Sequence, residues 1–318
     1  MRKRFADESN MHIPDGFLST PVWATMDAIA APSIAYIARR AQREFDDHRI
    51  PLMGVMGAFI FAAQMINFPV GSGTSGHLVG GALLSFTLGP AAASIVMTAI
   101  LATQALVFQD GGLLALGANV FNMAIAGVLA GYLPWVLLRG RKAGVFLGGT
   151  LSLLVSASLA LGELWRSGVR MPASVLAISI ALFTVSAIIE GAITLAVVQA
   201  LERIQPGFIR QPRGLGGKGF RGTSVLAGAS LALAAAGMWI ASTRPDGIEK
   251  LSQQIGLASH ARTFLASPLA EYKLQLVSSP FLAKSLAGLI GLFVVYIVCL
   301  CVSRVLLASR PAPEQEAA

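Results

Sequence analysis

The fold is decided by a stretch without formal charge, IPLMGVMGAFIFAAQMINFPVGSGTSGHLVGGALLSFTLGPAAASIVMTAILATQALVFQ, which spans residues 50–109. A membrane-crossing helix needs about 20 predominantly apolar residues, so this stretch has room for more than one span. The Gly89-Pro90 pair is expected to end one helix and begin another. The stretch therefore predicts a membrane protein with several helices, among them a segment at 77–88 that is too short to cross alone.

The rest of the chain has the same character. Of its 318 residues, 55 % are hydrophobic and only 13 % are charged, and the mean hydropathy is +0.68. Soluble domains carry about 25 % charged residues, so the composition argues against a soluble protein and indicates an all-α polytopic membrane protein. Reading the spans from the charge-free windows predicts nine helices, at 22–40, 51–68, 77–88, 90–108, 115–138, 144–162, 172–200, 223–242 and 284–305.

The net charge of +8 reflects membrane topology rather than a nucleic-acid partner. The 24 Lys and Arg residues form short clusters between apolar windows and build no aromatic-rich basic face. With nine passes and an outside N-terminus, 14 of these residues lie inside and 10 outside, as the positive-inside rule requires. Merging 77–108 into one helix would move the RGRK cluster at 139–142 outside. We therefore expect the N-terminus outside, the C-terminus inside and the lipid bilayer around the helices.

A basic run rich in Gly and Pro, QPGFIRQPRGLGGKGFRG at 205–222, divides the chain. It predicts a cytoplasmic linker between a seven-helix body at 11–204 and a C-terminal unit at 223–318 with a two-helix hairpin. Residues 1–10 contain the triplet Arg2, Lys3 and Arg4, which falls on the outside in this topology. We expect this extension to be absent or removed, so that the working chain begins at Met11.

Two histidines are candidates for metal binding. His77 lies within the charge-free stretch, where an ionisable side chain is a functional candidate by default; a helix-capping or hydrogen-bonded histidine is the alternative. If the chain begins at Met11, its amine, the His12 amide nitrogen and a His12 imidazole nitrogen close two small chelate rings, and His77 supplies a fourth nitrogen. Tetragonal nitrogen sites suit Ni²⁺ or Cu²⁺, with Co²⁺ also possible, whereas Zn²⁺ prefers a tetrahedral site.

These motifs carry a family resemblance. MHIPDGFLS at 11–19 and GTSGH at 73–77 resemble the substrate-capture (M-type) subunits of cobalt and nickel energy-coupling-factor transporters, and RPDGIEK at 244–250 resembles the PDGLE-type domain of the accompanying N-type subunit. The resemblance implies that Met11, His12 and His77 hold Ni²⁺ or Co²⁺ as the transported substrate, in a bacterial or archaeal cell membrane. It also implies a transmembrane coupling (T-type) subunit and a pair of cytoplasmic ATPases as partners. The chain has no G-x-x-x-x-G-K-[ST] loop, so we expect it not to be an enzyme.

The chain departs from the family pattern in its first ten residues. With them attached, the Met11 amine becomes a neutral peptide nitrogen and the chelate loses a donor. Around the two histidines, Asp15 is expected to make the turn that admits the terminal strand, glycines to allow close backbone approach, and two hydroxyls to orient the His77 ring. The alternative is a plain glycine-rich loop at a helix start. These supporting residues are Asp15, Gly73, Thr74, Ser75 and Gly76.

These features distinguish between three candidate functions. A metal-capture subunit of an ATP-driven importer accounts for both histidine motifs. A stand-alone proton-coupled channel or exchanger predicts a file of membrane carboxylates, for which only Asp27 and Glu190 are candidates, and Glu190 is more simply a paired or snorkelling group. A metallohydrolase would need H-E-x-x-H, which the sequence lacks. Planar nitrogen donors suit Ni²⁺, and the fusion of both units in one chain resembles nickel systems somewhat more, so we expect nickel slightly ahead of cobalt.

Overall fold

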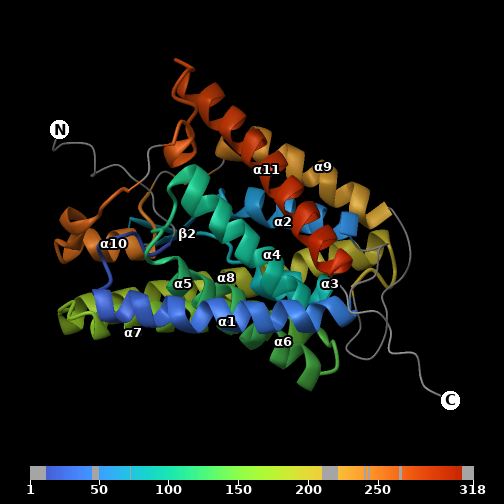
Figure 1. Ribbon diagram of the computed structural model, residues 1–318, viewed down its shortest axis with the longest axis horizontal. Helices are drawn as coiled ribbons and strands as arrows, with labels where there is room; N and C mark the ends of the chain where they lie inside the picture. The colour runs from blue at the N-terminus through green and yellow to red at the C-terminus, as the bar shows by residue number, and fades with distance from the viewer. Residues whose placement is uncertain are drawn as a thin grey trace.

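The computed structural model describes residues 12–44, 50–71, 73–209, 221–239, 241–242, 244–264 and 267–309. This part of the chain is almost entirely helical (Figure 1), which confirms the predicted all-α class. The longer helices are α1 (Thr20–Glu44), α2 (Ile50–Gln64), α4 (Pro90–Thr103), α6 (Val128–Leu137), α7 (Lys142–Arg166), α8 (Ala173–Ile204), α9 (Arg221–Ala236) and α11 (Pro280–Ala308). The shorter elements are α3 (Gly81–Leu88), α5 (Leu116–Asn119), α10 (Gly247–Gln254), the π-helical turns η2 (Gln104–Phe108) and η3 (Val120–Gly127), the 3-10 turns η4 (Gly237–Trp239), η5 (Leu257–His260) and η6 (Ala270–Tyr272), and the strands β1 (Phe68–Gly71) and β2 (Thr74–Gly76).

Several helices have the length and composition of membrane spans. Within the described residues, five are long and apolar enough to cross a bilayer, and α2 is a shorter apolar helix. Their outward faces carry exposed large apolar side chains, such as Leu133 on α6, Ile188 on α8 and Phe293 on α11, which suits contact with lipid tails. The multi-pass character is thus confirmed, whereas the count of nine spans and the orientation of the termini stay predictions. The five spans are 90–108, 116–137, 142–166, 173–204 and 280–308.

Helices α2 and α3 form the buried centre of the molecule. In α2, 12 of 15 residues are buried, and every residue of α3 is buried. Helix α3 packs against α4, α6 and α7. The predicted break between α3 and α4 is confirmed: Gly89 has φ 85°, a value that only glycine adopts readily, and Pro90 begins the next helix. A helix too short to span the bilayer is stable here because neighbouring helices cover its polar ends.

The C-terminal helices α9 and α11 lie side by side against α2 (Figure 1). Close approach depends on glycine: a Cβ at Gly57 would lie 2.7 Å from Cys299 Sγ, and one at Gly291 would lie 2.5 Å from the Phe61 ring. The polar segment between α9 and α11 carries α10, which packs against α8 and β2. The residues C-terminal to the predicted linker are therefore packed onto the helices that precede it. Residues 1–11 and 210–220, which include the predicted extension and most of that linker, lie outside the described residues.

The loop that follows α2 differs from the prediction. The sequence predicts a helix over 51–68, but α2 ends at Gln64. The chain then enters the β1–β2 hairpin, in which Phe68 pairs with Gly76. The predicted helix 77–88 begins only at Gly81. Gly80 has φ 78°, which no right-handed helix accommodates. The N–H groups of Val79 and Gly80 donate instead to the Glu190 carboxylate, so His77 lies in an extended segment rather than on a helix.

Candidate metal-binding site

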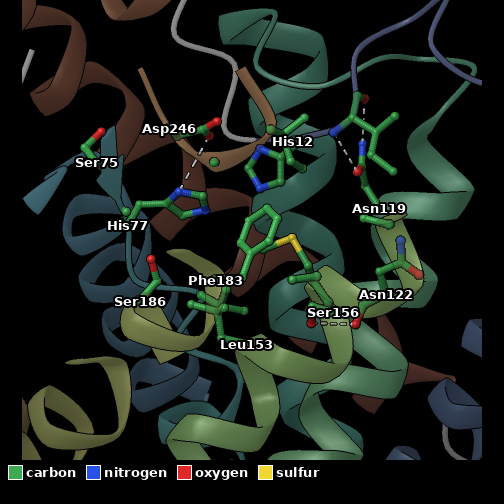
Figure 2. A pocket seen from close by; sticks show the side chains of 18 residues that line it. His12, Ser75, His77, Asn119, Asn122, Leu153, Ser156, Phe183, Ser186 and Asp246 are labelled. Carbon is green, nitrogen blue, oxygen red and sulfur yellow. Dashed lines mark hydrogen bonds and ion pairs between the residues drawn. The ribbon is translucent and has the colours of Figure 1, made fainter. Parts of the chain in front are cut away.

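A small cavity of about 70 Å³ lies where three parts of the chain meet. They are the non-helical residues 12–19 before α1, which we call the terminal strand, the β1–β2 hairpin, and the polar segment between α9 and α11, which we call the C-terminal segment. Figure 2 shows His12 and His77 on opposite sides of it, with Asp246 above them and Phe183 and Leu153 below. Most of its lining is apolar, so a polar group that enters must find its partners among a few side chains and backbone groups. The lining residues come from the segment before α1, from β2 and the segment that follows it, from α5 and η3, and from α7, α8 and the start of α10.

The fold brings His12 and His77 together. Their ring centroids are 6.1 Å apart and the ring planes are inclined by 54°. A metal-binding imidazole nitrogen lies about 2 Å from its ion, so rings at this separation lie within reach of one ion between them. Met11, the third predicted donor residue, lies outside the described residues. The proximity of the two histidines, 65 positions apart in the chain, is the central geometric feature of the site.

His12 is almost completely buried, with 2 % of its surface exposed. Its Nδ1 lies 3.2 Å from Oδ1 of Asp110, while its Nε2 is buried without a hydrogen-bond partner. The other oxygen of Asp110 accepts a hydrogen bond of 2.6 Å from the Tyr272 hydroxyl. Burial, together with the neighbouring Asp110 charge, raises the pKa of Tyr272 well above its ordinary value, so this hydroxyl keeps its proton and donates.

The contact with Asp110 bears directly on the predicted chelate. Only Nδ1, the ring nitrogen nearer to Cβ, closes a small ring with the His12 amide nitrogen. In this structure Asp110 engages that nitrogen, so the chelate requires the ring to turn away from Asp110. The sequence analysis did not assign Asp110 to the site, although it is the first charge after the uncharged stretch 50–109, a position that singles it out.

His77 faces a carboxylate that the sequence analysis left without a role. Its Nδ1 lies 3.9 Å from Oδ2 of Asp246, and neither atom has a hydrogen-bond partner. Desolvation and the neighbouring His12 lower the pKa of His77 to about 4, so its imidazole is neutral and able to bind a metal at neutral pH. Burial raises the pKa of Asp246 to about 8, and a cation in the pocket would favour its charged form.

The terminal strand is held by side chains that satisfy its backbone. The Ile13 N–H donates to Oδ1 of Asn119 and the Ile13 carbonyl accepts from Nδ2 of Asn119, both at 3.1 Å. Asp15 accepts hydrogen bonds from three successive amides, those of residues 113–115, just before α5. The predicted turn residue Asp15 therefore ties the strand to the start of a helix, where a carboxylate is favoured by the helix dipole.

The hairpin before His77 is joined to the C-terminal segment. The Ser75 N–H donates to the Pro245 carbonyl at 2.8 Å, and the Ser75 hydroxyl donates to the Arg244 carbonyl at 2.6 Å. Ser75 was expected to orient the His77 ring, but its hydroxyl is used in this second bond. Thr74 Oγ1 is buried without a partner, so it makes no such bond either.

The glycines of this loop serve two purposes. Gly73 has φ 72° at the tip of the hairpin, and a Cβ there would meet nothing within 4 Å, so its role is conformational. At Gly76, by contrast, a Cβ would lie 2.6 Å from Oγ of Ser186 on α8. The predicted close approach thus occurs at Gly76 and lets the residue before His77 pack directly on α8.

The two carboxylates considered for proton transfer both bind backbone. Glu190 is fully buried, and its oxygens accept from Val79 N–H at 3.0 Å and Gly80 N–H at 2.8 Å. Glu190 is therefore a paired carboxylate rather than a free proton-transfer group, and it holds the turn that follows His77. Asp27 accepts a hydrogen bond of 2.8 Å from the Gly117 N–H.

Among the described side chains, no group of three or more His, Cys, Asp and Glu residues is arranged to hold a metal ion. The predicted donor set does not need one, because two of its four nitrogens belong to the main chain. His12 and His77 would supply the two imidazoles.

Comparison with known proteins shows the family to which the chain belongs. Residues 12–208 match the family model described as the cobalt uptake substrate-specific transmembrane region, and residues 222–308 match the PDGLE domain. A putative metal transport protein of Haloquadratum walsbyi is 40 % identical over 203 residues, which cover 63 % of this chain and 93 % of that protein. A putative fused nickel transport protein of Archaeoglobus fulgidus is 32 % identical over 292 residues, 90 % of this chain and 95 % of that protein.

A solved structure is also similar. The crystal structure of a truncated transition metal transporter is 35 % identical in sequence and superposes with a TM-score of 0.54, covering 61 % of this chain and 99 % of that one. The matching part of this chain thus shares both fold and sequence with a transition metal transporter.

Proposed function

The chain belongs to the family of the cobalt uptake substrate-specific transmembrane region, with a PDGLE domain in the same polypeptide, and on this premise we propose that it captures Ni²⁺ or Co²⁺ for an ATP-driven importer of the energy-coupling-factor type. The observation that carries the proposal is the facing pair His12 and His77, 6.1 Å apart between ring centroids in a buried pocket. Two imidazoles in a largely apolar cavity favour a borderline transition-metal ion over Mg²⁺ or Ca²⁺.

In the proposed complex, four nitrogens surround the ion. Three come from the start of the chain, namely the Met11 amine and the amide and Nδ1 of His12, and the fourth comes from His77. The amide nitrogen must lose its proton, so binding releases protons and weakens at low pH. This arrangement requires a chain that begins at Met11, and it requires His12 Nδ1 to exchange Asp110 for the metal.

Nickel is the preferred ion in this proposal. Planar nitrogen coordination suits Ni²⁺, and the relative from Archaeoglobus fulgidus that matches both units is named a fused nickel transport protein. Equal uptake of both ions at matched free concentrations would contradict the preference while leaving metal capture intact.

The partners follow from the importer type. Uptake would need a transmembrane coupling subunit and a pair of cytoplasmic ATPases, with ATP hydrolysed on those partners. With the N-terminus outside and the C-terminus inside, the basic segments at 39–50 and 139–142 face the cytoplasm and would be available to the coupling subunit.

The test begins with the N-terminal peptide of the protein purified from its own membrane, whose mass distinguishes a start at Met1 from a start at Met11. Equilibrium titration with Ni²⁺ and Co²⁺ follows, for the unaltered chain and for His12→Ala and His77→Ala. His260→Ala is the matched control, because the His260 side chain is exposed and lies outside the pocket lining. We expect tight binding by the unaltered chain and the control only. An unaltered chain that binds neither ion would overturn the proposed function.

A stand-alone proton-coupled exchanger is less well supported. Its two candidate carboxylates, Asp27 and Glu190, accept hydrogen bonds from backbone amides and hold secondary structure together. A carboxylate used in this way is not available for proton exchange without unfolding the turn that it stabilises.

A further inference from the structure

A carboxylate from the C-terminal segment faces a metal-binding candidate without touching it. Asp246 is 2 % exposed, and its Oδ2 lies 3.9 Å from Nδ1 of His77 (Figure 2). Both atoms are buried and lack a hydrogen-bond partner. Buried polar atoms are rarely left unpaired, and two that face each other just beyond hydrogen-bond distance indicate a bond that forms in another state of the site.

The position of Asp246 is determined by its neighbours. Its other oxygen, Oδ1, accepts from the Glu249 N–H at 2.8 Å and so caps the first turn of α10. The preceding carbonyls of Arg244 and Pro245 accept the two bonds from Ser75, two residues before His77. The segment that presents the carboxylate is thus tied to the strand that presents the imidazole.

Oδ1 of Asp246 caps α10, whereas Oδ2 faces the pocket and is available for another hydrogen bond. Capping needs only Oδ1, because a single side-chain oxygen satisfies an N-terminal amide. Figure 2 shows the other nitrogen of His77 pointing across the pocket toward the His12 ring. A bond between Oδ2 and Nδ1–H would therefore hold the ring with Nε2 directed at the ion.

We propose that Asp246 is a positioning residue for His77: in the metal-loaded pocket its Oδ2 accepts a hydrogen bond from Nδ1–H of His77, which leaves Nε2 as the metal donor. The inference rests on the proposed function, since it concerns the same pocket. A shortening of about 1 Å brings the pair to hydrogen-bond distance. Metal-binding histidines usually donate their second N–H to such a partner, and loss of the partner typically costs about 10- to 100-fold in metal affinity.

The experiment titrates the full chain with Ni²⁺ and compares it with Asp246→Asn. Asparagine is as good an N-cap as aspartate, so its Oδ1 keeps α10 capped, while its amide places a donor rather than an acceptor opposite Nδ1. Asp246→Ser is the second variant, because serine also caps the helix and removes the carboxylate altogether. Glu249→Gln is the matched control. Glu249 lies on α10, three residues after Asp246, and its side chain does not line the pocket, so this variant removes a nearby negative charge without changing the lining.

We expect both Asp246 variants to bind Ni²⁺ about 10- to 100-fold more weakly, with melting temperatures close to the unaltered chain in the absence of metal. At saturating Ni²⁺, the ligand-field absorption band should move to longer wavelength, because an imidazole without its carboxylate partner is a weaker donor. The control should show neither change. A purely structural role would leave the band of the saturated complex where it is.

The outcomes separate this inference from the proposed function. If the unaltered chain binds Ni²⁺ and His77→Ala does not, but both Asp246 variants match the unaltered chain in affinity and absorption band, the positioning role is wrong and metal capture stands. If the unaltered chain binds neither Ni²⁺ nor Co²⁺, metal capture itself fails.

Discussion

The two sides of the pocket hold their histidines in opposite ways. On the terminal-strand side, Nδ1 of His12 already has a partner, Asp110, at 3.2 Å. On the hairpin side, Nδ1 of His77 has none and faces Asp246 at 3.9 Å. In the proposed complex, metal binding would therefore require His12 to release Asp110 and His77 to gain a hydrogen bond to Asp246.

The supports behind the two histidines differ as well. The strand that carries His12 is bound by Asn119 and Asp15, which connect it to the start of α5. The turn after His77 is clamped by Glu190 from α8, and the hairpin before it is bound to the C-terminal segment through Ser75. The C-terminal segment reaches both sides, because Tyr272 holds Asp110 while Asp246 faces His77.

The largest effect is expected from removing either histidine. His12→Ala and His77→Ala should each abolish high-affinity binding of Ni²⁺, because each removes an imidazole from a site with few side-chain donors. Equilibrium titration of the purified chain measures this, with His260→Ala as control. If one variant kept the affinity of the unaltered chain, the two sides would not share a single ion.

A nearly equal loss is expected when residues ahead of Met11 are retained. Even one retained residue makes the Met11 nitrogen part of a peptide bond and removes a donor on the His12 side only. Proton release on binding should fall as well, since the anchored chelate is what favours loss of the His12 amide proton. Titration in buffers of different ionisation enthalpy reports both quantities. Unchanged affinity for the extended chain would rule out the amine as a ligand.

Glu190→Gln is expected to loosen the turn after His77 and to leave the His12 side of the pocket unchanged. Glutamine keeps one acceptor oxygen but places an NH₂ donor against a backbone N–H of Val79 or Gly80. Losing a buried charge-assisted hydrogen bond costs about 1.5–3 kcal/mol, so the melting temperature should fall. The Ni²⁺ affinity should fall by about tenfold, or about 1.4 kcal/mol, because His77 is less well placed. A lower melting temperature with full affinity would show that the clamp serves stability only.

Tyr272→Phe should have the smallest effect, on the His12 side. It removes the hydroxyl that donates to Asp110 but keeps the ring, which stacks on Phe108 with centroids 4.7 Å apart. The hydroxyl also accepts a hydrogen bond of 3.2 Å from Nε2 of Gln104. Each buried hydrogen bond contributes about 1 kcal/mol, and thermal unfolding without metal should show the loss of both. We expect a change in Ni²⁺ affinity smaller than that of Glu190→Gln; a larger change would mean that Tyr272 controls the orientation of His12 through Asp110.

The fold class followed from patterns that act locally. Charge-free windows marked the helices because the bilayer excludes charges, and the Gly89-Pro90 pair located a break that the structure places at the same residues. The predicted start of helix 77–88 was wrong because a distant residue, Glu190, accepts hydrogen bonds from the amides of Val79 and Gly80. No window around His77 contains that information.

Part of the candidate site was likewise predictable from the sequence, and part of it was not. His12 and His77 stood out because ionisable groups are rare in apolar sequence, and the structure places their rings together. Asp246 lay in a motif that the sequence analysis recognised, RPDGIEK, but its direction into the pocket depends on how Ser75 binds the Arg244 and Pro245 carbonyls. Asp110 was visible only as the charge that closes the uncharged stretch.

The sequence by itself determined that this chain is helical, crosses a membrane and carries two histidines suited to a transition metal, because hydropathy and side-chain chemistry belong to each residue. Which nitrogen of each histidine is free, and which carboxylate faces it, was decided only by the tertiary structure. Those contacts join residues 98 and 169 positions apart. They exist because segments from both ends of the chain meet at one buried pocket, where each polar atom must find its partner inside the protein.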